Sequence, residues 1–198
     1  MTRPPSRSHL LAALVICGLA FAGRPASAQE WVSPEALMSM QRDAMKSLSK
    51  LDGLWRGKAI RHLHDGTTKE MVQTERVGTM LDGTLRVIEG RGYEADGSLA
   101  FQAFAVLSYD TSKRSYSMRS HSAGRSGDFV FRKTDKGFDW EIPAGPATIR
   151  YTATIDKGVW KERGERIEKG RPPQLLVELE LRRLGDTDWP AAGSVGSK

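Results

Sequence analysis

The chain of 198 residues has the length of one domain rather than two. Hydrophobic residues make up 39% and charged residues 27% of it, a balance that excludes a polytopic membrane protein and a disordered chain. The formal charge is +6, and three of the excess positive charges lie in residues 1–28, which hold no acid. The small excess that remains is interleaved with acids. It is not the basic stripe of a nucleic-acid-binding protein, so we expect no nucleic-acid partner.

Residues 1–28 have the pattern of a secretory signal peptide. Arg3 and Arg7 precede an apolar run over 9–22, which is too short to span a membrane, and Ala26-Ser27-Ala28 forms a small-x-small cleavage site. We therefore predict cleavage near Ala28, a periplasmic or secreted mature protein and no membrane span after cleavage. An uncleaved anchor and lipid attachment at Cys17 are the alternatives, although Ile16 is a poor neighbour for a lipidated cysteine. Because Cys17 is the only cysteine, the mature chain would have no disulfide and no thiolate.

The segment 29–50 is predicted to be helical. Ser33-Pro34-Glu35 is a typical helix start, and an apolar stripe of period 3.6 follows at Leu37, Met40, Ala44, Met45 and Leu48. These signals predict one amphipathic helix from about Pro34 to Lys50. Its methionine-rich face is expected to pack on its own domain, with a partner or ligand as the alternative.

From Leu51 onward, turn signals such as Asp-Gly recur between short runs rich in β-branched and aromatic residues. Ten strands are predicted, and no helix lies between them: Leu54–Leu63, Glu70–Met80, Thr84–Tyr93, Leu99–Tyr109, Ser115–Ser122, Asp128–Lys133, Phe138–Ile142, Ala147–Ile155, Val159–Ile167 and Gln174–Leu184. Sequential hairpins favour a meander that closes on itself. We therefore predict an all-β, antiparallel up-and-down barrel of about 8–10 strands over 51–185, followed by a flexible tail over 186–198.

Two of these strands show which side faces the core. The last strand alternates Leu175, Val177, Leu179 and Leu181 with charged residues, as a half-buried strand does. The run over 99–109 is apolar on both faces, so we expect the N-terminal helix to cover its outer side. Gly90-Arg91-Gly92 predicts a bulge or tight bend, and the stretch 124–127 predicts a hairpin turn.

The pattern Gly53-Leu54-Trp55-Arg56-Gly57 at the first strand resembles the start of calycin-type barrels, the lipocalins, fatty-acid-binding proteins and nitrobindin-like proteins. The chain is most similar to a bacterial lipocalin-like family of unknown function, through 81–83, 107–110, 160–165 and 181–183, and the likeness covers about residues 50–185. The resemblance implies a small ligand cavity within the barrel. It also implies haem binding by a histidine near the chain end in nitrobindin-like members, but the last histidine here is His121, so that feature does not carry over.

Few residues of the mature chain suggest chemistry. His62 and His64 would share one face of a strand, a spacing that zinc or copper can use, and His121 could join them only if the fold brings it near. The alternative is a pair of surface histidines beside a turn. The sequence has no nucleophile elbow and no phosphate-binding loop. Because the spacing of histidines alone does not supply the ligand count and geometry of a metal site, we predict no metal and no cofactor.

The hairpin around Lys157-Gly158 carries the most informative pattern. If these two residues form its turn, Ala153 pairs with Glu162 and Arg150 with Glu165. One face then holds Tyr151, Ala153, Ile155, Trp160, Glu162 and Gly164, and its single carboxylate is Glu162. A buried carboxylate is costly unless it is paired, so Glu162 is expected to be a cavity group or half of an ion pair. Arg119 is a candidate partner, although the pattern of Ser115–Ser122 leaves open which face of that strand points inward.

These observations predict a periplasmic, non-enzymatic protein that binds a small, partly apolar molecule inside the barrel. The predicted ligand-binding residues are Trp55, Tyr116, Arg119, His121, Tyr151, Trp160 and Glu162. Two alternatives remain open at this point. One is a small hydrolase or isomerase that uses Glu162 as acid or base with His121, and the other is an envelope protein whose helix or outer face docks a partner.

Overall fold

The ten predicted strands and the one predicted helix are all present in a computed structural model, which describes residues 31–190. The elements are α1 (Pro34–Lys46), a short 3-10 helix (Ser49–Leu51), β1 (Gly53–His62), β2 (Thr68–Met80), β3 (Leu85–Tyr93), β4 (Leu99–Asp110), β5 (Ser115–Ser122), β6 (Arg125–Lys133), β7 (Gly137–Ala144), β8 (Ala147–Asp156), β9 (Val159–Glu168) and β10 (Gln174–Gly185). The predicted signal peptide and residues 191–198 of the predicted tail lie outside the described residues.

Helix α1 begins where the sequence predicts. The Ser33 hydroxyl accepts a hydrogen bond from the backbone N–H of Ala36 at 3.2 Å, and Pro34 occupies the first turn. The helix ends at Lys46, earlier than the predicted Lys50, because the chain tightens into the 3-10 turn Ser49–Leu51 before it enters β1. No helix within residues 31–190 is long and apolar enough to cross a membrane.

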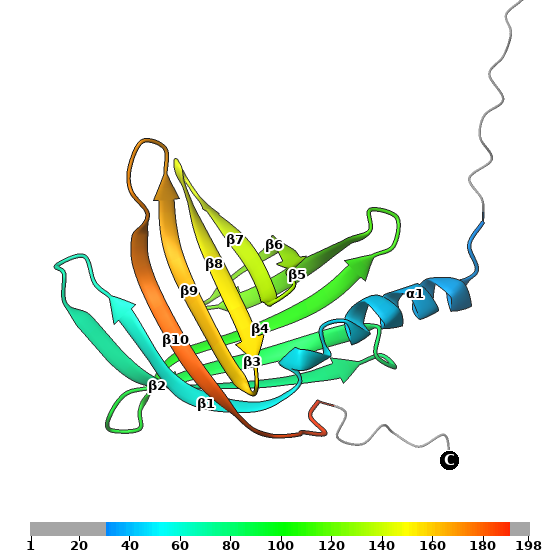
Figure 1. The fold of residues 1–198 in the computed structure, drawn as a ribbon, viewed down its shortest axis with the longest axis horizontal. Helices are drawn as coiled ribbons and strands as arrows, with labels where there is room; N and C mark the ends of the chain where they lie inside the picture. The colour runs from blue at the N-terminus through cyan, green and yellow to red at the C-terminus, as the bar shows by residue number, and fades with distance from the viewer. Residues whose placement is uncertain (1–30, 191–198) are drawn as a thin grey trace, which may run out of the picture. The chain divides into compact units, whose positions relative to one another are not determined.

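The strands form one closed antiparallel barrel in the order β1-β10-β9-β8-β7-β6-β5-β4-β3-β2 (Figure 1). Each strand pairs with its neighbours in sequence, and β1 pairs with β10 to close the sheet. The seam between β6 and β7 is short, since its only pairs are Phe131–Trp140, Arg132–Asp139 and Lys133–Phe138. The remaining parts of these two strands, 125–130 and 141–144, are therefore not joined to each other.

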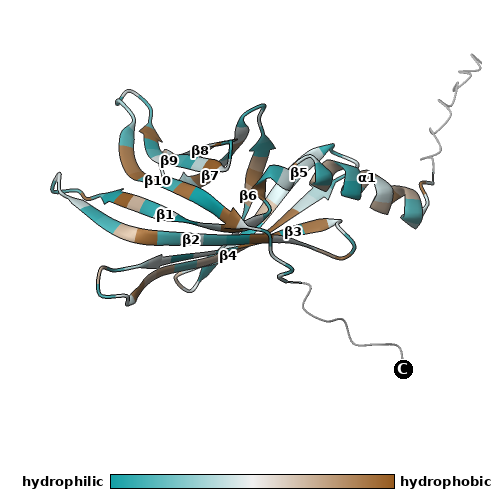
Figure 2. Ribbon diagram, turned by 60° about the horizontal axis from the view of Figure 1, so that its bottom comes forward, coloured by the Kyte–Doolittle hydropathy of each residue, from teal (hydrophilic) through white to brown (hydrophobic). Residues whose placement is uncertain are grey.

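The two ends of the barrel differ. One end, the helix end, carries the turns over 81–84, 111–114, 134–136 and 157–158 together with α1, which runs beside the ends of β3 and β4 (Figure 1). Met45, Leu48 and Leu51 enter the hydrophobic core there. The opposite end, called here the far end, carries the loops over 63–67, 94–98, 123–124, 145–146 and 169–173. Strands in Figure 2 show hydrophobic and hydrophilic segments in alternation, as the pattern of half-buried strands requires.

Aromatic side chains fill the helix end. Trp55 packs edge-to-face on Trp160 at a centroid distance of 5.7 Å, and Phe138 packs on Trp160 at 5.6 Å. The Trp55 indole donates to the Leu51 carbonyl at 2.8 Å, which joins the 3-10 turn to the core. Such pairs contribute about 0.5–1.5 kcal/mol each beyond the area they bury. This end is therefore the packed, rigid half of the barrel.

The outer face of β4 is not covered by α1 as expected. The helix instead caps the barrel end, where the Tyr116 hydroxyl donates to the Ala44 carbonyl at 2.9 Å. Phe104, in the middle of β4, packs edge-to-face on Trp189 at 6.5 Å, and the Arg76 guanidinium lies 4.4 Å from the Trp189 ring centre. The described start of the predicted tail, 186–190, thus packs on the outside of β2 and β4 rather than hanging loose.

The structure refines two glycine-containing stretches. The turn predicted over 124–127 is shorter, because Ala123 and Gly124 alone have positive φ and form a two-residue hairpin, so that β6 starts at Arg125. The irregularity predicted at Gly90-Arg91-Gly92 lies at its end, where the register against β4 shifts between Gly92 and Tyr93, whereas both glycines sit in regular pairs with β2.

Candidate functional site

Glu162 lies on the inner face of β9, as the register of the β8–β9 hairpin predicts. The predicted pairs Ala153–Glu162 and Arg150–Glu165 are both confirmed. Glu162 is 9% exposed, and its two oxygens accept hydrogen bonds from two different indoles. Trp140 on β7 donates to Oε1 at 3.2 Å, and Trp160 donates to Oε2 at 3.1 Å. The indole N–H groups thus hold the carboxyl in place from two strands.

Burial raises the pKa of Glu162 to about 7, although the two indole hydrogen bonds oppose this shift by favouring the charged form. The effect extends to Tyr151 on β8, whose pKa is raised by its own burial and by the neighbouring Glu162. Tyr151 stacks on Trp140 with 4.1 Å between the ring centres and 7° between the planes. Glu162 is therefore a carboxyl with a pKa near neutral pH, and it lies beside the stacked rings of Trp140 and Tyr151.

A second carboxyl, Glu75 on β2, shares this interior. It lies on the same face as the buried Gln73 and Val77, and the Gln73 amide donates to its Oε1 at 2.7 Å. Burial is the main cause that raises the pKa of Glu75 to about 8, and the charge of Glu162 contributes to this rise. The interior therefore holds a second carboxyl beside Glu162, and the sequence analysis had singled out Glu162 alone.

Sequence reasoning missed Glu75, although a usable signal was present. The turn around Leu81-Asp82-Gly83 fixes the β2–β3 register, which pairs Glu75 with Gly90. A Cβ at Gly90 would lie 2.7 Å from Oε1 of Glu75, so the glycine leaves the space that the carboxyl occupies. An acid that alternates with Val77 on one strand and faces a glycine on the next indicates an inward carboxyl.

Neither carboxyl has a basic partner within residues 31–190. The hydrogen bonds to Glu75 and Glu162 come from an amide and two indoles, and no cation contributes to either pKa. Arg86, buried at the helix end, pairs with Asp52. Arg166, two inward positions beyond Glu162 on β9, pairs with Glu168 at 3.2 Å. The predicted partner Arg119 lies elsewhere, so the expected ion pair with Glu162 does not form.

The inner surface around the two carboxyls is called here the acidic inner surface. Its aromatic members Phe129, Trp140 and Tyr151 are only half-buried even though they face inward. Gly164 provides room for Tyr151, since a Cβ there would lie 2.7 Å from the tyrosine ring. The short β6–β7 seam ends beside Phe129 and Trp140.

The other predicted site residues separate into two groups. Trp55 and Trp160 belong to the packed helix end, and Tyr116 is bonded to α1, so these three form the base below the acidic inner surface. Arg119 and His121 are on the outer face of β5. Arg119 pairs there with Asp128 at 2.7 Å, with both side chains exposed. The two groups lie on opposite sides of the sheet and cannot contact one ligand inside the barrel.

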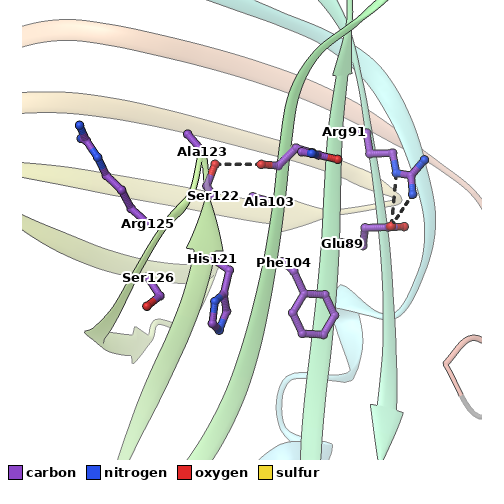
Figure 3. A pocket seen from close by; sticks show the side chains of 11 residues that line it. Glu89, Arg91, Ala103, Phe104, His121, Ser122, Ala123, Arg125 and Ser126 are labelled. Carbon is purple, nitrogen blue, oxygen red and sulfur yellow. Dashed lines mark hydrogen bonds and ion pairs between the residues drawn. The ribbon is translucent and has the colours of Figure 1, made fainter.

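His121 does line a pocket, which lies on β3–β6 and has a volume of about 460 Å³ (Figure 3). The pocket is bordered by Phe104, by Arg125 and by Arg91, which is paired with Glu89 at 2.7 Å. Its polar groups are exposed or already paired, so water competes for them. The acidic inner surface, with its buried groups, is the stronger candidate site.

The histidines do not assemble into a metal site. His62 lies 3.2 Å from Glu178 on β10, whereas His121 is on β5. Residues 31–190 contain no group of three or more His, Cys, Asp or Glu side chains that could hold a metal ion.

The fold matches the crystal structure of Rv2717c from M. tuberculosis with a TM-score of 0.54. The match covers 71% of this chain and 96% of that chain at 14% sequence identity. No protein-family model matches the sequence, and no curated protein is similar to it. The likeness shows the barrel architecture alone, and function has to be argued from the site.

Proposed function

We propose that this protein is a non-enzymatic binder of a small, partly apolar molecule, which it holds against the acidic inner surface of the barrel. The observation that carries the proposal is the Glu162 carboxyl, buried on the inner face and fixed by the indoles of Trp140 and Trp160. Small-molecule sites combine an aromatic wall with a few fixed polar groups, and Tyr151 stacked on Trp140 supplies such a wall.

The packing of the barrel supports this proposal. The helix end is packed by α1 and by aromatic rings, whereas inward-facing residues remain half-exposed toward the far end. A ligand would enter at the far end, beside the short β6–β7 seam, and stop at the layer of Trp160. The resemblance to lipocalin-like barrels, which bind ligands inside the barrel, points the same way.

The site of action that we propose is the periplasm or the extracellular medium. The Ala26-Ser27-Ala28 pattern predicts removal of the first 28 residues. Intact-mass measurement of the exported protein tests this, and a product that starts at Gln29 is expected. A full-length product in the membrane fraction, or a lipid on Cys17, would contradict it.

Native mass spectrometry of the protein purified from the periplasm of its own organism tests the binding. We expect a retained small molecule that is released on unfolding, with reduced occupancy in Glu162→Gln. The glutamine side chain keeps the shape of the original but can accept only one of the two indole hydrogen bonds. Glu165→Gln, on the outer face of the same strand, is the control and should retain the molecule. Equal occupancy in both variants, or an empty wild-type protein, would refute this site.

A second candidate, acid–base catalysis, is favoured by the pair of carboxyls with pKa values of about 7 and about 8. Near neutral pH one can be protonated while the other is ionised, the arrangement that a hydrolase or isomerase uses. His121 would take no part, because it lies on the outer face of β5. Incubation of the released molecule with the protein distinguishes the two functions: an unchanged molecule supports binding alone, and a change in its mass or retention time supports catalysis.

A further inference from the structure

We propose that the ligand of the acidic inner surface is an organic cation, an amine with an apolar body, whose ammonium group lies beside the carboxyls of Glu75 and Glu162. This inference rests on the proposed function and adds the chemical class of the ligand. It follows from three observations: two carboxyls inside the barrel without a cationic partner, hydrogen-bond acceptors that have no donor, and a wall of aromatic rings.

The first observation is the charge inside the barrel. Glu162 is nine-tenths buried and Glu75 faces it from β2, yet no lysine or arginine of residues 31–190 bonds to either. The nearest inward cation along β9, Arg166, is already paired with Glu168. Buried carboxylates are stable when a positive charge lies next to them, and the described part of the chain places none beside these two. A bound cation would fill that role.

The second observation is that the hydrogen-bonding groups left unpaired at this surface are acceptors and not donors. Both indole donors are taken by Glu162, and the Gln73 amide nitrogen is taken by Glu75. Gln73 is itself 4% exposed, and its Oε1 accepts no hydrogen bond from the described part of the chain. When Glu75 is ionised, the free acceptors include the Gln73 oxygen and the second oxygen of Glu75. The surface therefore offers acceptors to a ligand that donates, and an ammonium group carries up to three donors.

The third observation is the aromatic surface beside the acids. Trp140 and Tyr151 stack on each other, and Phe129 packs on Trp140 at a centroid distance of 5.8 Å. The π faces of aromatic rings attract cations by about 0.5–2 kcal/mol and also bury apolar groups. An amine with an aromatic or alkyl body satisfies both the carboxyls and this wall, whereas an anion would be repelled by two acids.

The proposal predicts how binding depends on pH. The groups that face Glu162 are Glu75, Tyr151 and the two indoles, and none of them is a cation. Because the pKa of Glu162 is about 7, the ionised form that an ammonium prefers is scarce at pH 6 and dominant at pH 8. The affinity for an amine should therefore be about tenfold weaker at pH 6 than at pH 8, since apparent affinity scales with the population of the competent state.

The experiment compares three probes with the same phenylbutyl body: 4-phenylbutylamine, 4-phenylbutan-1-ol and 4-phenylbutyrate. Binding is followed by NMR through the indole N–H signals of Trp140 and Trp160, with Trp189 on the outer face as the internal control. We expect the amine to shift the two inner signals with at least tenfold higher affinity than the alcohol, and the acid to bind least. Glu75→Gln should weaken amine binding at least tenfold and leave alcohol binding unchanged, whereas Glu70→Gln, exposed on the outer side of β2, should change neither.

Two results would overturn the inference in distinguishable ways. If the alcohol or the acid binds as tightly as the amine, or if the molecule retained by the purified protein has no basic nitrogen, the ligand is not a cation but the proposed binding function stands. If no probe shifts the Trp140 and Trp160 signals and the purified protein retains no molecule, both the inference and the proposed function fail.

Discussion

Arg86 and Asp52 form a two-pronged ion pair beneath α1, in which Nε of Arg86 lies 2.6 Å from Oδ1 of Asp52 and Nη2 lies 2.8 Å from Oδ2. Arg86 is 1% exposed, and its third nitrogen donates to the Met45 carbonyl near the end of α1. One buried guanidinium therefore joins the helix, the start of β1 and the start of β3. This junction ties α1 to the packed helix end of the barrel.

Replacement of Asp52 by Asn should destabilise the protein strongly. The change leaves the Arg86 charge buried, and the Asn NH2 group lies opposite one N–H donor of Arg86, which loses its acceptor. Breaking a buried ion pair typically costs about 3–5 kcal/mol. Asp128→Asn is the matched control, because the Arg119–Asp128 pair has a similar distance of 2.7 Å but is exposed, and such pairs contribute about 0–1 kcal/mol. Urea unfolding of both variants measures the difference, and losses of equal size would show that burial of Arg86 is not what matters.

The raised pKa of Glu75 predicts a pH-dependent stability. Between pH 4.5 and about 8 the unfolded chain has released the Glu75 proton, whereas the folded protein still holds it. The free energy of unfolding should therefore fall as pH rises through this window and level off above it. Glu162, with a pKa of about 7, adds a fall of the same sign between pH 4.5 and about 7.

Glu75→Gln should remove the Glu75 share of this fall. The substituted side chain is neutral at every pH and can still accept the Gln73 hydrogen bond, so we expect the variant to match wild type near pH 4.5. At pH 8.5 it should exceed wild type by on the order of 1–3 kcal/mol. Thermal or urea unfolding at several pH values checks this, with Glu70→Gln as the exposed control. Parallel curves for wild type and Glu75→Gln would contradict the assigned burial of the carboxyl.

A substitution at Gly57 tests how closely the backbones of β1 and β10 approach each other. A Cβ on Gly57 would overlap the Glu180 carbonyl oxygen and lie 2.8 Å from the Leu181 Cα, both backbone atoms that cannot move alone. Gly57→Ala should therefore prevent folding or lower stability by about 3 kcal/mol or more. Gly185→Ala, at the end of β10 with open space around it, should be nearly neutral. The yield of folded protein and urea unfolding decide between these outcomes, and a stable Gly57→Ala protein would disprove the close approach.

Local sequence signals predicted the strands of this protein well, because each hairpin has its own turn and its own alternation. The two-residue turn at Lys157-Gly158 alone placed Glu162 opposite Ala153 and on the inner face. The prediction that Arg119 reaches Glu162 was wrong because Ser115–Ser122 has mixed residues on both faces and gives no alternation to read. The pairing of β5 with β4 and β6 determines which face of β5 points inward.

Contacts between distant segments could not be predicted in the same way. Trp189 follows the last strand in a polar stretch that has no turn or strand pattern, yet it packs on Phe104 and Arg76, which lie far from it in the sequence. The proximity of Glu75 on β2 and Glu162 on β9 likewise depends on closure of the barrel between β1 and β10, which no local register specifies. Sequence reasoning therefore predicted one half of the acidic inner surface and missed the other.

The packing of Trp189 leads to the last prediction. Trp189→Ala should lower the free energy of unfolding by about 1–3 kcal/mol, because it removes the ring that covers Phe104 and the cation–π contact with Arg76. Trp31→Ala is the control, because it makes the same substitution at a side chain that is 80% exposed. It should change the free energy of unfolding by less than about 0.5 kcal/mol. Urea unfolding compares the two, and ligand binding should survive in both variants because the acidic inner surface lies across the sheet from Trp189. If Trp189→Ala is as stable as Trp31→Ala, residues 186–190 do not hold the outer face of β4, and the expectation of a loose tail would apply to them as well.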